Sequence, residues 1–196
     1  ITTVQDGLAS RKDVEHFKNL ADKEKLKIDV ISYPKVNSNP DKIIEENKDC
    51  TNKYYNRFKI GGYKMILDGS PQGRSAWLTK PYKGEENYRG YPWYEDKKVK
   101  NFITKAVKDN QQLLTHCNGD AAADQLLRNY ELVLEESENP DKWNLRPVMI
   151  HSQILRNEQL DKIGELDMIS SMFVAHTYYW GDVHLKNLGP ERGSRI

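Results

Sequence analysis

The chain contains 196 residues, which suits one domain or a large part of one. Its 30 basic and 29 acidic residues nearly cancel, so charge favours neither nucleic acid nor a membrane surface as a partner. No apolar run approaches the ~20 residues that cross a bilayer, no signal peptide is visible, and the two cysteines lie outside any CxxC pair, which indicates a cytoplasmic protein with reduced thiols.

The hydrophobic pattern predicts strands that alternate with helices along the whole chain. Strands are predicted at residues 1–4, 28–33, 63–67, 113–116, 148–151 and 168–175. Helices are predicted at residues 11–27, 41–58, 96–110, 121–136 and 157–165, and the chain from residue 177 onwards is predicted to be loop. Alternating strands and helices joined by short polar turns imply a parallel sheet in an α/β fold.

Residues 71–94 form a long segment without periodicity that holds several Trp and Tyr residues among glycines and prolines. A loop of this length in a compact domain is usually functional, and its aromatic content argues against disorder. No GxGxxG sequence follows the first predicted strand. The six predicted strands therefore fit part of a (β/α) barrel better than a dinucleotide-binding sheet.

Two histidines end successive predicted strands. His116 follows an apolar run in LLTHCNGDAAAD, and His151 follows another in RPVMIHSQ. They are 151 − 116 = 35 residues apart, close to the ~30 residues of a βαβ unit. Ligands bind at the carboxyl ends of parallel strands, and neutral imidazole is the commonest metal ligand. The pattern therefore indicates a metal site, and the alternative is a pair of buried, hydrogen-bonded histidines.

Lys64 lies inside the apolar strand YKMIL. A buried lysine is costly unless it is neutralised or paired, and a lysine with a lowered pKa reacts with carbon dioxide to form a carbamate that bridges two metal ions. The alternative is a lysine at the strand edge whose ammonium group reaches solvent.

Two aspartates follow predicted strands. Asp68 offers a carboxylate to a ligand or belongs to an ordinary turn, DGS. Asp120 opens a helix, where it is an N-cap or, in a functional role, a residue that orients a metal-binding ring.

A last group of polar and aromatic residues follows the final predicted strand. His176 and Trp180 belong to HTYYWGD, which lines a substrate pocket or is a packed loop. His16 and His184 are expected at the surface. Cys117 is expected to be a small buried residue rather than a nucleophile.

These residues occur in segments that together resemble a known family. The segments are YKMILDGSPQGRSAWLTKPY, LLTHCNGDAAAD, RPVMIHSQ, SMFVAHTYYWGD and LGPER. In this order and spacing they resemble the metal-dependent amidohydrolase superfamily, and within it amidohydrolase family 3, the YtcJ-like or N-substituted formamide deformylase-like proteins. The resemblance covers essentially the whole chain.

The resemblance implies a (β/α)8 barrel in which this chain supplies approximately strands 2–7. It implies that His116 and His151 bind one or two divalent metal ions, with zinc expected, and that Lys64 is carboxylated and bridges them. His176, Trp180 and Asp68 are expected beside the substrate, Asp120 behind the metal ligands, and residues 71–94 as a lid. The expected reaction is hydrolysis of a C–N bond in a small amide, such as an N-acyl or N-formyl amine, by metal-activated water.

The chain also departs from the family pattern. The HxH pair of the first barrel strand and the aspartate of the eighth, which serves as ligand and general base, are not in this sequence. The chain is therefore expected to be an internal segment that is inactive alone, and its open sheet edges are expected to pair with another copy. The competing hypothesis is a non-catalytic module that binds a small molecule or another protein through its aromatic loop.

Overall fold

The strands of the computed structural model, which describes residues 1–196, all run parallel. They are β1 (Thr3–Ala9), β2 (Asp29–Pro34), β3 (Phe58–Ile60), β4 (Gly62–Ile66), β5 (Gln112–Cys117), β6 (Val148–His151) and β7 (Ile169–Met172). They form one sheet of order β1-β2-β3 and another of order β4-β5-β6-β7. The prediction of an α/β fold with parallel strands is confirmed.

The two sheets follow one another almost without a break. Only Gly61 separates β3 from β4, and the backbone N–H of Gly61 donates to the Ser32 carbonyl at 3.0 Å. Beyond the end of β2, the N–H of Val36 donates to the carbonyl of Lys64 in β4 at 2.9 Å. β4 thus continues the line of β3 along β2 and its extension, and within each sheet every strand pairs with its predecessor in the chain.

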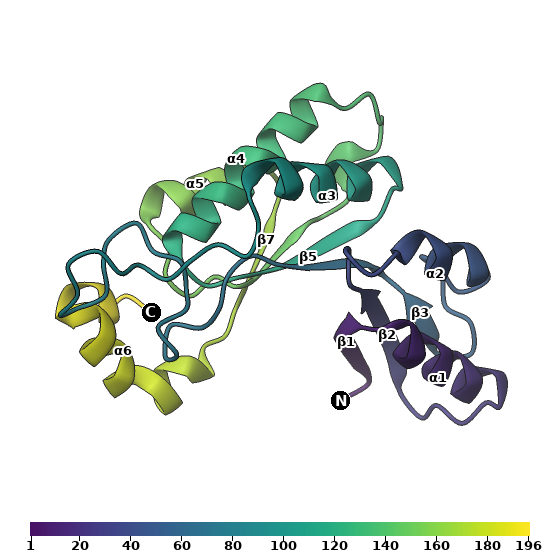
Figure 1. Cartoon of the computed structure of the whole chain (residues 1–196). Helices are drawn as coiled ribbons and strands as arrows, with labels where there is room; N and C mark the ends of the chain where they lie inside the picture. Colours follow the sequence, from purple (N-terminus) through teal and green to yellow (C-terminus); the bar gives the residue numbers. More distant parts are fainter.

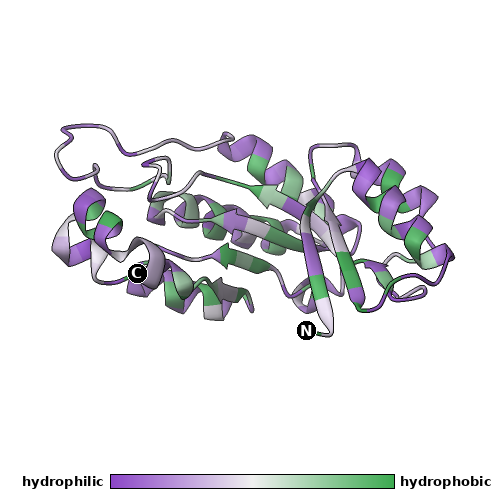
Figure 2. Ribbon diagram, turned by 90° about the horizontal axis from the view of Figure 1, so that it is seen from below, coloured by the Kyte–Doolittle hydropathy of each residue, from purple (hydrophilic) through white to green (hydrophobic).

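Five of the six helices pack against the strands, and the sixth packs against residues 71–94. They are α1 (Arg11–Asp22), α2 (Pro40–Glu46), α3 (Asp96–Lys108), α4 (Asp120–Glu136), α5 (Asn157–Glu165) and α6 (Ala175–Gly193), with a short 3-10 turn, η1 (Lys142–Asn144). Figure 1 shows α3, α4 and α5 grouped along one side of β5 and β7, and α1 and α2 beside β1–β3. Figure 2 shows hydrophobic residues along the strands and hydrophilic residues on much of the helical surface. No helix has both the length and the apolar character to span a membrane.

Alternation along β4 and β5 separates core residues from site residues. Tyr63, Met65 and Leu113 belong to the apolar core formed with α3, α4 and α5. Successive side chains of a strand point to opposite faces, so Lys64 and His116 share the face turned away from these helices. The buried core thus fixes the direction of both predicted metal ligands.

The structure corrects three predictions. The helix predicted at 41–58 ends at Glu46, and its last residue, Phe58, begins β3. The strand predicted at 168–175 ends at Met172, so His176 lies in the first turn of α6 instead of at a strand end. The tail predicted as loop from residue 177 forms most of α6, and His184, expected at the surface, is fully buried.

The segment 71–94 contains no helix or strand, as predicted, and side chains of α6 hold it in place. The side chain of Asn187 in α6 donates to the carbonyl of Pro71 at 3.1 Å, and that of Arg192 donates to the carbonyl of Pro81 at 2.6 Å. Ala76, Leu78, Tyr82, Ile154 and Leu188 form a separate small apolar core between this segment and α6. The aromatic loop and α6 therefore form one packed layer.

Candidate metal centre

Three predicted ligands lie on neighbouring strands. In the register of the sheet, Lys64 lies beside Leu114, and Cys117 beside His151. The rings of His116 and His151 meet edge to face, with centroids 4.5 Å apart and an angle of 77° between their planes. The structure thus brings both predicted imidazole ligands together at the carboxyl ends of β5 and β6.

Both rings are held in the neutral form. Burial, followed by the fields of His151 and Lys64, lowers the pKa of His116 to about 4. Burial, followed by the fields of Lys64 and His176, lowers the pKa of His151 to about 4. Neutral imidazole has the free lone pair that a metal ion requires.

Lys64 is 7% exposed and forms no ion pair with a carboxylate. Burial lowers the pKa of its ammonium group to about 8. A lysine that reaches solvent at the strand edge does not fit this burial. An amine with such a pKa is uncharged in a substantial fraction of molecules near pH 8, which is the form that reacts with carbon dioxide.

His116 has one hydrogen-bond partner, Asn118, and one carboxylate nearby, Asp68. Its Nε2 lies 3.0 Å from Nδ2 of Asn118 and 4.0 Å from Oδ1 of Asp68. Sequence reasoning did not identify Asn118. The available signal was its position two residues after His116, which favours the same face of an extended backbone.

Asp68 has both carboxylate oxygens engaged. Its Oδ1 accepts the N–H of Asn118 at 3.0 Å, and its Oδ2 accepts the N–H groups of Gly119 at 2.7 Å and Trp77 at 3.0 Å. Burial raises the pKa of Asp68 to about 7, while the three N–H donors act in the opposite direction. The carboxylate joins the end of β4 to the turn after β5 and to the aromatic loop.

His151 has an unusual backbone and an unpaired nitrogen. Its φ is +77° and that of Ser152 is +49°, in the left-handed region that non-glycine residues rarely adopt. The ring Nδ1 of His151 is buried and has no hydrogen-bond partner. Residues with a strained backbone cluster at functional sites, and a buried polar atom without a partner also calls for an explanation.

These features are compatible with a metal ion, although the ligand set is small. Two neutral imidazoles, one with an unpaired buried nitrogen, and a partly uncharged lysine are the groups that would hold it. No three or more His, Cys, Asp or Glu side chains gather closely enough to hold a metal ion by themselves.

The other predicted site residues lie at different distances from this centre. His176 is buried, with its ring centroid 6.3 Å from that of His151. Trp180 is 41% exposed on α6. The carboxylate of Asp120 accepts from Thr79 and Arg156 and contacts no histidine ring, so the contact expected of it is made by Asn118.

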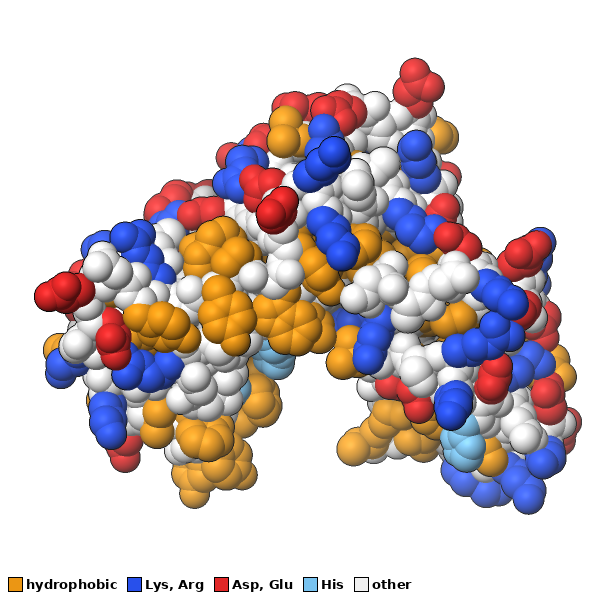
Figure 3. Space-filling view, viewed as in Figure 1, with side chains coloured by type: hydrophobic (Ala, Val, Ile, Leu, Met, Phe, Trp, Pro, Cys, Tyr) orange, Lys and Arg blue, Asp and Glu red, His pale blue; other side chains and the backbone are white.

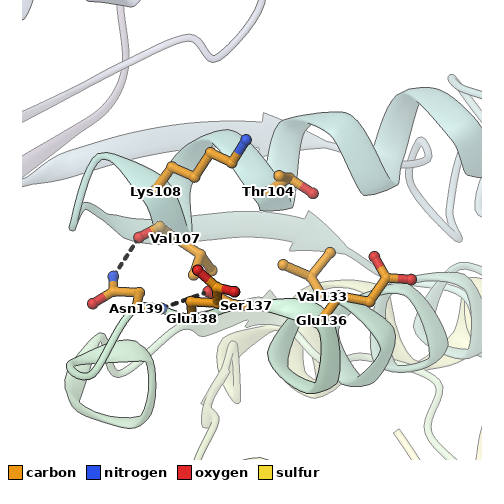
Figure 4. A pocket seen from close by; sticks show the side chains of 8 residues that line it. All are labelled: Thr104, Val107, Lys108, Val133, Glu136, Ser137, Glu138 and Asn139. Carbon is orange, nitrogen blue, oxygen red and sulfur yellow. Dashed lines mark hydrogen bonds between the residues drawn. The ribbon is translucent and has the colours of Figure 1, made fainter.

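Cavities lie on both sides of the three predicted ligands. One of about 370 Å³ is bordered by His151, Phe173 and Thr177, and one of about 210 Å³ is bordered by Lys64 and Trp93. Figure 3 shows the molecule hollowed on one side between its two ends, with histidine surface at the edge of the hollow. The largest cavity, about 560 Å³, lies between the carboxyl ends of α3 and α4 (Figure 4). The chain enters β5 soon after α3, so this cavity is near the amino ends of the strands. Its position separates it from the histidines.

The parallel sheet carries two neutral histidines at the carboxyl ends of its strands. The chain is thus an α/β protein of the class that binds ligands at these strand ends. The sequence model described as "Amidohydrolase family" matches residues 1–196. The chain therefore belongs to the amidohydrolase family.

Two curated proteins are similar to the chain in sequence. The chain is 26% identical over 125 residues to "Putative amidohydrolase YtcJ" of Bacillus subtilis (strain 168), an alignment that covers 62% of this chain. It is 31% identical over 133 residues to "Protein LONG AFTER FAR-RED 3" of Arabidopsis thaliana, covering 68% of this chain. Each alignment covers 22% of the relative, so the chain matches about a fifth of these proteins.

Solved structures share the fold. An uncharacterised metal-dependent hydrolase from Pyrococcus furiosus superposes with a TM-score of 0.78 at 22% identity, covering 97% of this chain and 37% of that one. A counterpart from Pyrococcus horikoshii OT3 gives a TM-score of 0.76 at 22% identity, covering 97% of this chain and 36% of that one. The fold of this chain is thus found in metal-dependent hydrolases of greater length.

Proposed function

We propose that the chain is the central part of the barrel of a metal-dependent hydrolase, with its metal centre at the carboxyl ends of β4, β5 and β6. The observation that carries the proposal is the meeting of two neutral histidine rings, 4.5 Å apart, at adjacent strand ends within the field of a buried lysine. Strand ends of this kind hold the active sites of characterised (β/α)8 barrels.

The barrel itself is part of the proposal. Parallel strands in chain order, β1-β2-β3 and β4-β5-β6-β7, with helices packed against them, are the arrangement of a barrel wall. If β3 and β4 are counted as one interrupted strand, the chain has six barrel strands, which we assign to strands 2–7 of the barrel. The first and eighth barrel strands would supply the remaining metal ligands.

Each residue of the site has a specific part in the proposed reaction. His116 and His151 would hold a divalent ion, zinc being the first candidate, and a carboxylated Lys64 would bridge two ions. Such an ion polarises a carbonyl and makes water nucleophilic at neutral pH. Asn118, whose Nδ2 lies 3.0 Å from Nε2, would orient the ring of His116, and His176 would hydrogen-bond the substrate carbonyl beside it.

We propose small amides as substrates, with N-acyl and N-formyl amines as the first candidates. Trp180 and the aromatic loop would surround the bound amide; Trp93 borders the cavity beside Lys64 and is half exposed. A cover of this kind excludes bulk water and strengthens electrostatic interactions in the site.

The chain alone is expected to lack hydrolytic activity because it offers no free general base. The carboxylate nearest to His116 is that of Asp68, and both of its oxygens accept backbone N–H groups. A carboxylate held in this way positions other groups and is poorly placed to accept a proton from water.

Metal content tests the proposal directly. The full-length protein should contain a divalent metal by elemental analysis and hydrolyse N-acyl or N-formyl amines, and a chelator should abolish the activity. His116→Ala and His151→Ala should each lose metal and at least 100-fold in kcat/KM. His16→Ala is the matched control, because His16 is exposed on α1, and it should retain both. A full-length protein without bound metal, or one indifferent to these two substitutions, contradicts the proposal.

A further inference from the structure

Four of the five histidines of the chain form a row that extends beyond the proposed metal centre. Successive ring centroids lie 4.5 Å apart from His116 to His151, 6.3 Å from His151 to His176, and 5.5 Å from His176 to His184. The first three belong to the site as proposed above. The fourth, His184, has no assigned part.

His184 lies in α6 with a relative exposure of 0%, and both of its ring nitrogens are buried without a hydrogen-bond partner. An unpaired buried polar atom costs free energy, and an apolar side chain would avoid that cost. The interaction that the ring does make is a stack on His176, with only 11° between the two planes.

The ring of His176 depends on packing for its orientation. Its Nδ1 is buried without a partner, so no hydrogen bond from that atom fixes the ring. Phe173 contacts it edge to face, with centroids 4.9 Å apart, and His184 stacks on it. Phe173 is half exposed, whereas His184 is fully buried. His184 is therefore the more rigidly placed of the two rings that contact His176.

The position of His184 is itself fixed by the aromatic loop. Three residues further along α6, the side chain of Asn187 donates to the carbonyl of Pro71, and the carbonyl of Asn187 accepts the N–H of Lys83. The stack therefore connects the orientation of His176 to the segment that borders the site.

We propose that His184 is a positioning residue, whose stacked ring fixes the plane of His176 and the direction in which His176 faces the substrate. This inference rests on the proposed function only in placing His176 beside a substrate. The fixing of the ring plane is a property of the fold and is measurable without any reaction.

Two substitutions separate stacking from simple space filling. His184→Phe retains a flat ring, whereas His184→Leu fills the core without one, and both remove the unpaired nitrogens. In the full-length protein with ¹³C-labelled histidine, His184→Leu should shift and broaden the NMR signals of the His176 ring, while His184→Phe leaves them sharp. His184→Leu should also lower kcat about 10-fold with a smaller change in KM, and His184→Phe should restore kcat to within about threefold of the parent.

The controls distinguish failure of this inference from failure of the proposed function. Metal content should be the same in the parent and both variants, and the melting temperature of His184→Phe should not fall below that of the parent, because no ring nitrogen is left unpaired. Identical His176 signals in the Phe and Leu variants overturn the positioning role. If the parent hydrolyses no amide, the proposed function fails, and the NMR comparison still decides whether His184 fixes His176.

Discussion

At the scale of single residues, Lys64 shows how a buried charge affects stability. Its pKa is lowered by burial to about 8, from 10.5 in the unfolded chain. Between these values the unfolded chain binds more protons than the folded protein, so the free energy of unfolding should rise with pH from about 8 to 10.5. The full difference corresponds to about 3 kcal/mol as an upper limit, at 1.36 kcal/mol per unit of pKa.

Urea unfolding of the metal-free protein at pH 7.5 and pH 9.5 measures this effect. The parent should gain roughly 2 kcal/mol relative to Lys64→Met over this interval, because only the parent loses a buried charge. Comparing the two proteins cancels the titration of tyrosines and cysteines. Equal pH dependence in both proteins would show that the ammonium group is solvated or paired.

The same residues show what a sequence reveals about a site. The strand positions of Lys64 and His116 were predictable because Lys64 lies within an apolar run and His116 follows one, and the register then gives them a common face. Asn118 and His184 were not predictable. The contact of Asn118 with His116 depends on the turn after β5, and the burial of His184 depends on a helix that the sequence pattern did not indicate.

At the scale of elements, the turn before α4 is the tightest junction near the site. A Cβ added to Gly119 would lie 1.9 Å from the carbonyl oxygen of Trp77, which accepts the N–H of Ala121. The backbone N–H of Gly119 also donates to Asp68. The close approach of two backbone segments, rather than any need for a positive φ, therefore requires glycine here.

Gly119→Ala should destabilise the protein by about 2–4 kcal/mol, because the loop backbone must move and the bonds to Asp68 weaken. Gly164→Ala in α5 is the matched control, since an added Cβ there meets no atom within 4 Å. It should be neutral or stabilising by up to about 1 kcal/mol, as alanine favours helix. Chemical denaturation of both variants checks this, and equal stability of the two would remove the argument for a tight junction.

The elements that were predicted wrongly have identifiable physical causes. The segment after Glu46 is charged enough to suggest a helix, but pairing of residues 58–60 with β2 takes precedence over local propensity. In α6, Gly189 has a φ of +81° and is followed by Pro190, and these residues obscured the helical pattern. The hydrophobic sequence pattern is clearer in strands buried on both faces than in a helix that packs against an irregular loop.

At the scale of the whole molecule, the open sheet determines how the chain should behave in solution. β1 and β7 each pair on one side only, and β7 carries exposed apolar residues, including Met172 at 56% exposure. Unpaired strand edges are templates for association with another chain. A contact from the β7 edge of one copy to the β1 edge of the next is head to tail, so it leaves further edges open.

The 22.8 kDa chain, expressed alone, should therefore self-associate at micromolar concentration, with a mass above the monomer value in light scattering after gel filtration. Met172→Lys places a charge on the β7 edge and should return the mass towards that of the monomer, because strand pairing would bury the new ammonium group. Leu132→Lys is the control, since Leu132 is a comparably apolar, exposed residue on α4, away from both edges, and it should leave the association unchanged. A parent chain that is monomeric throughout, or equal loss of association in both variants, would show that the strand edges do not drive the contact.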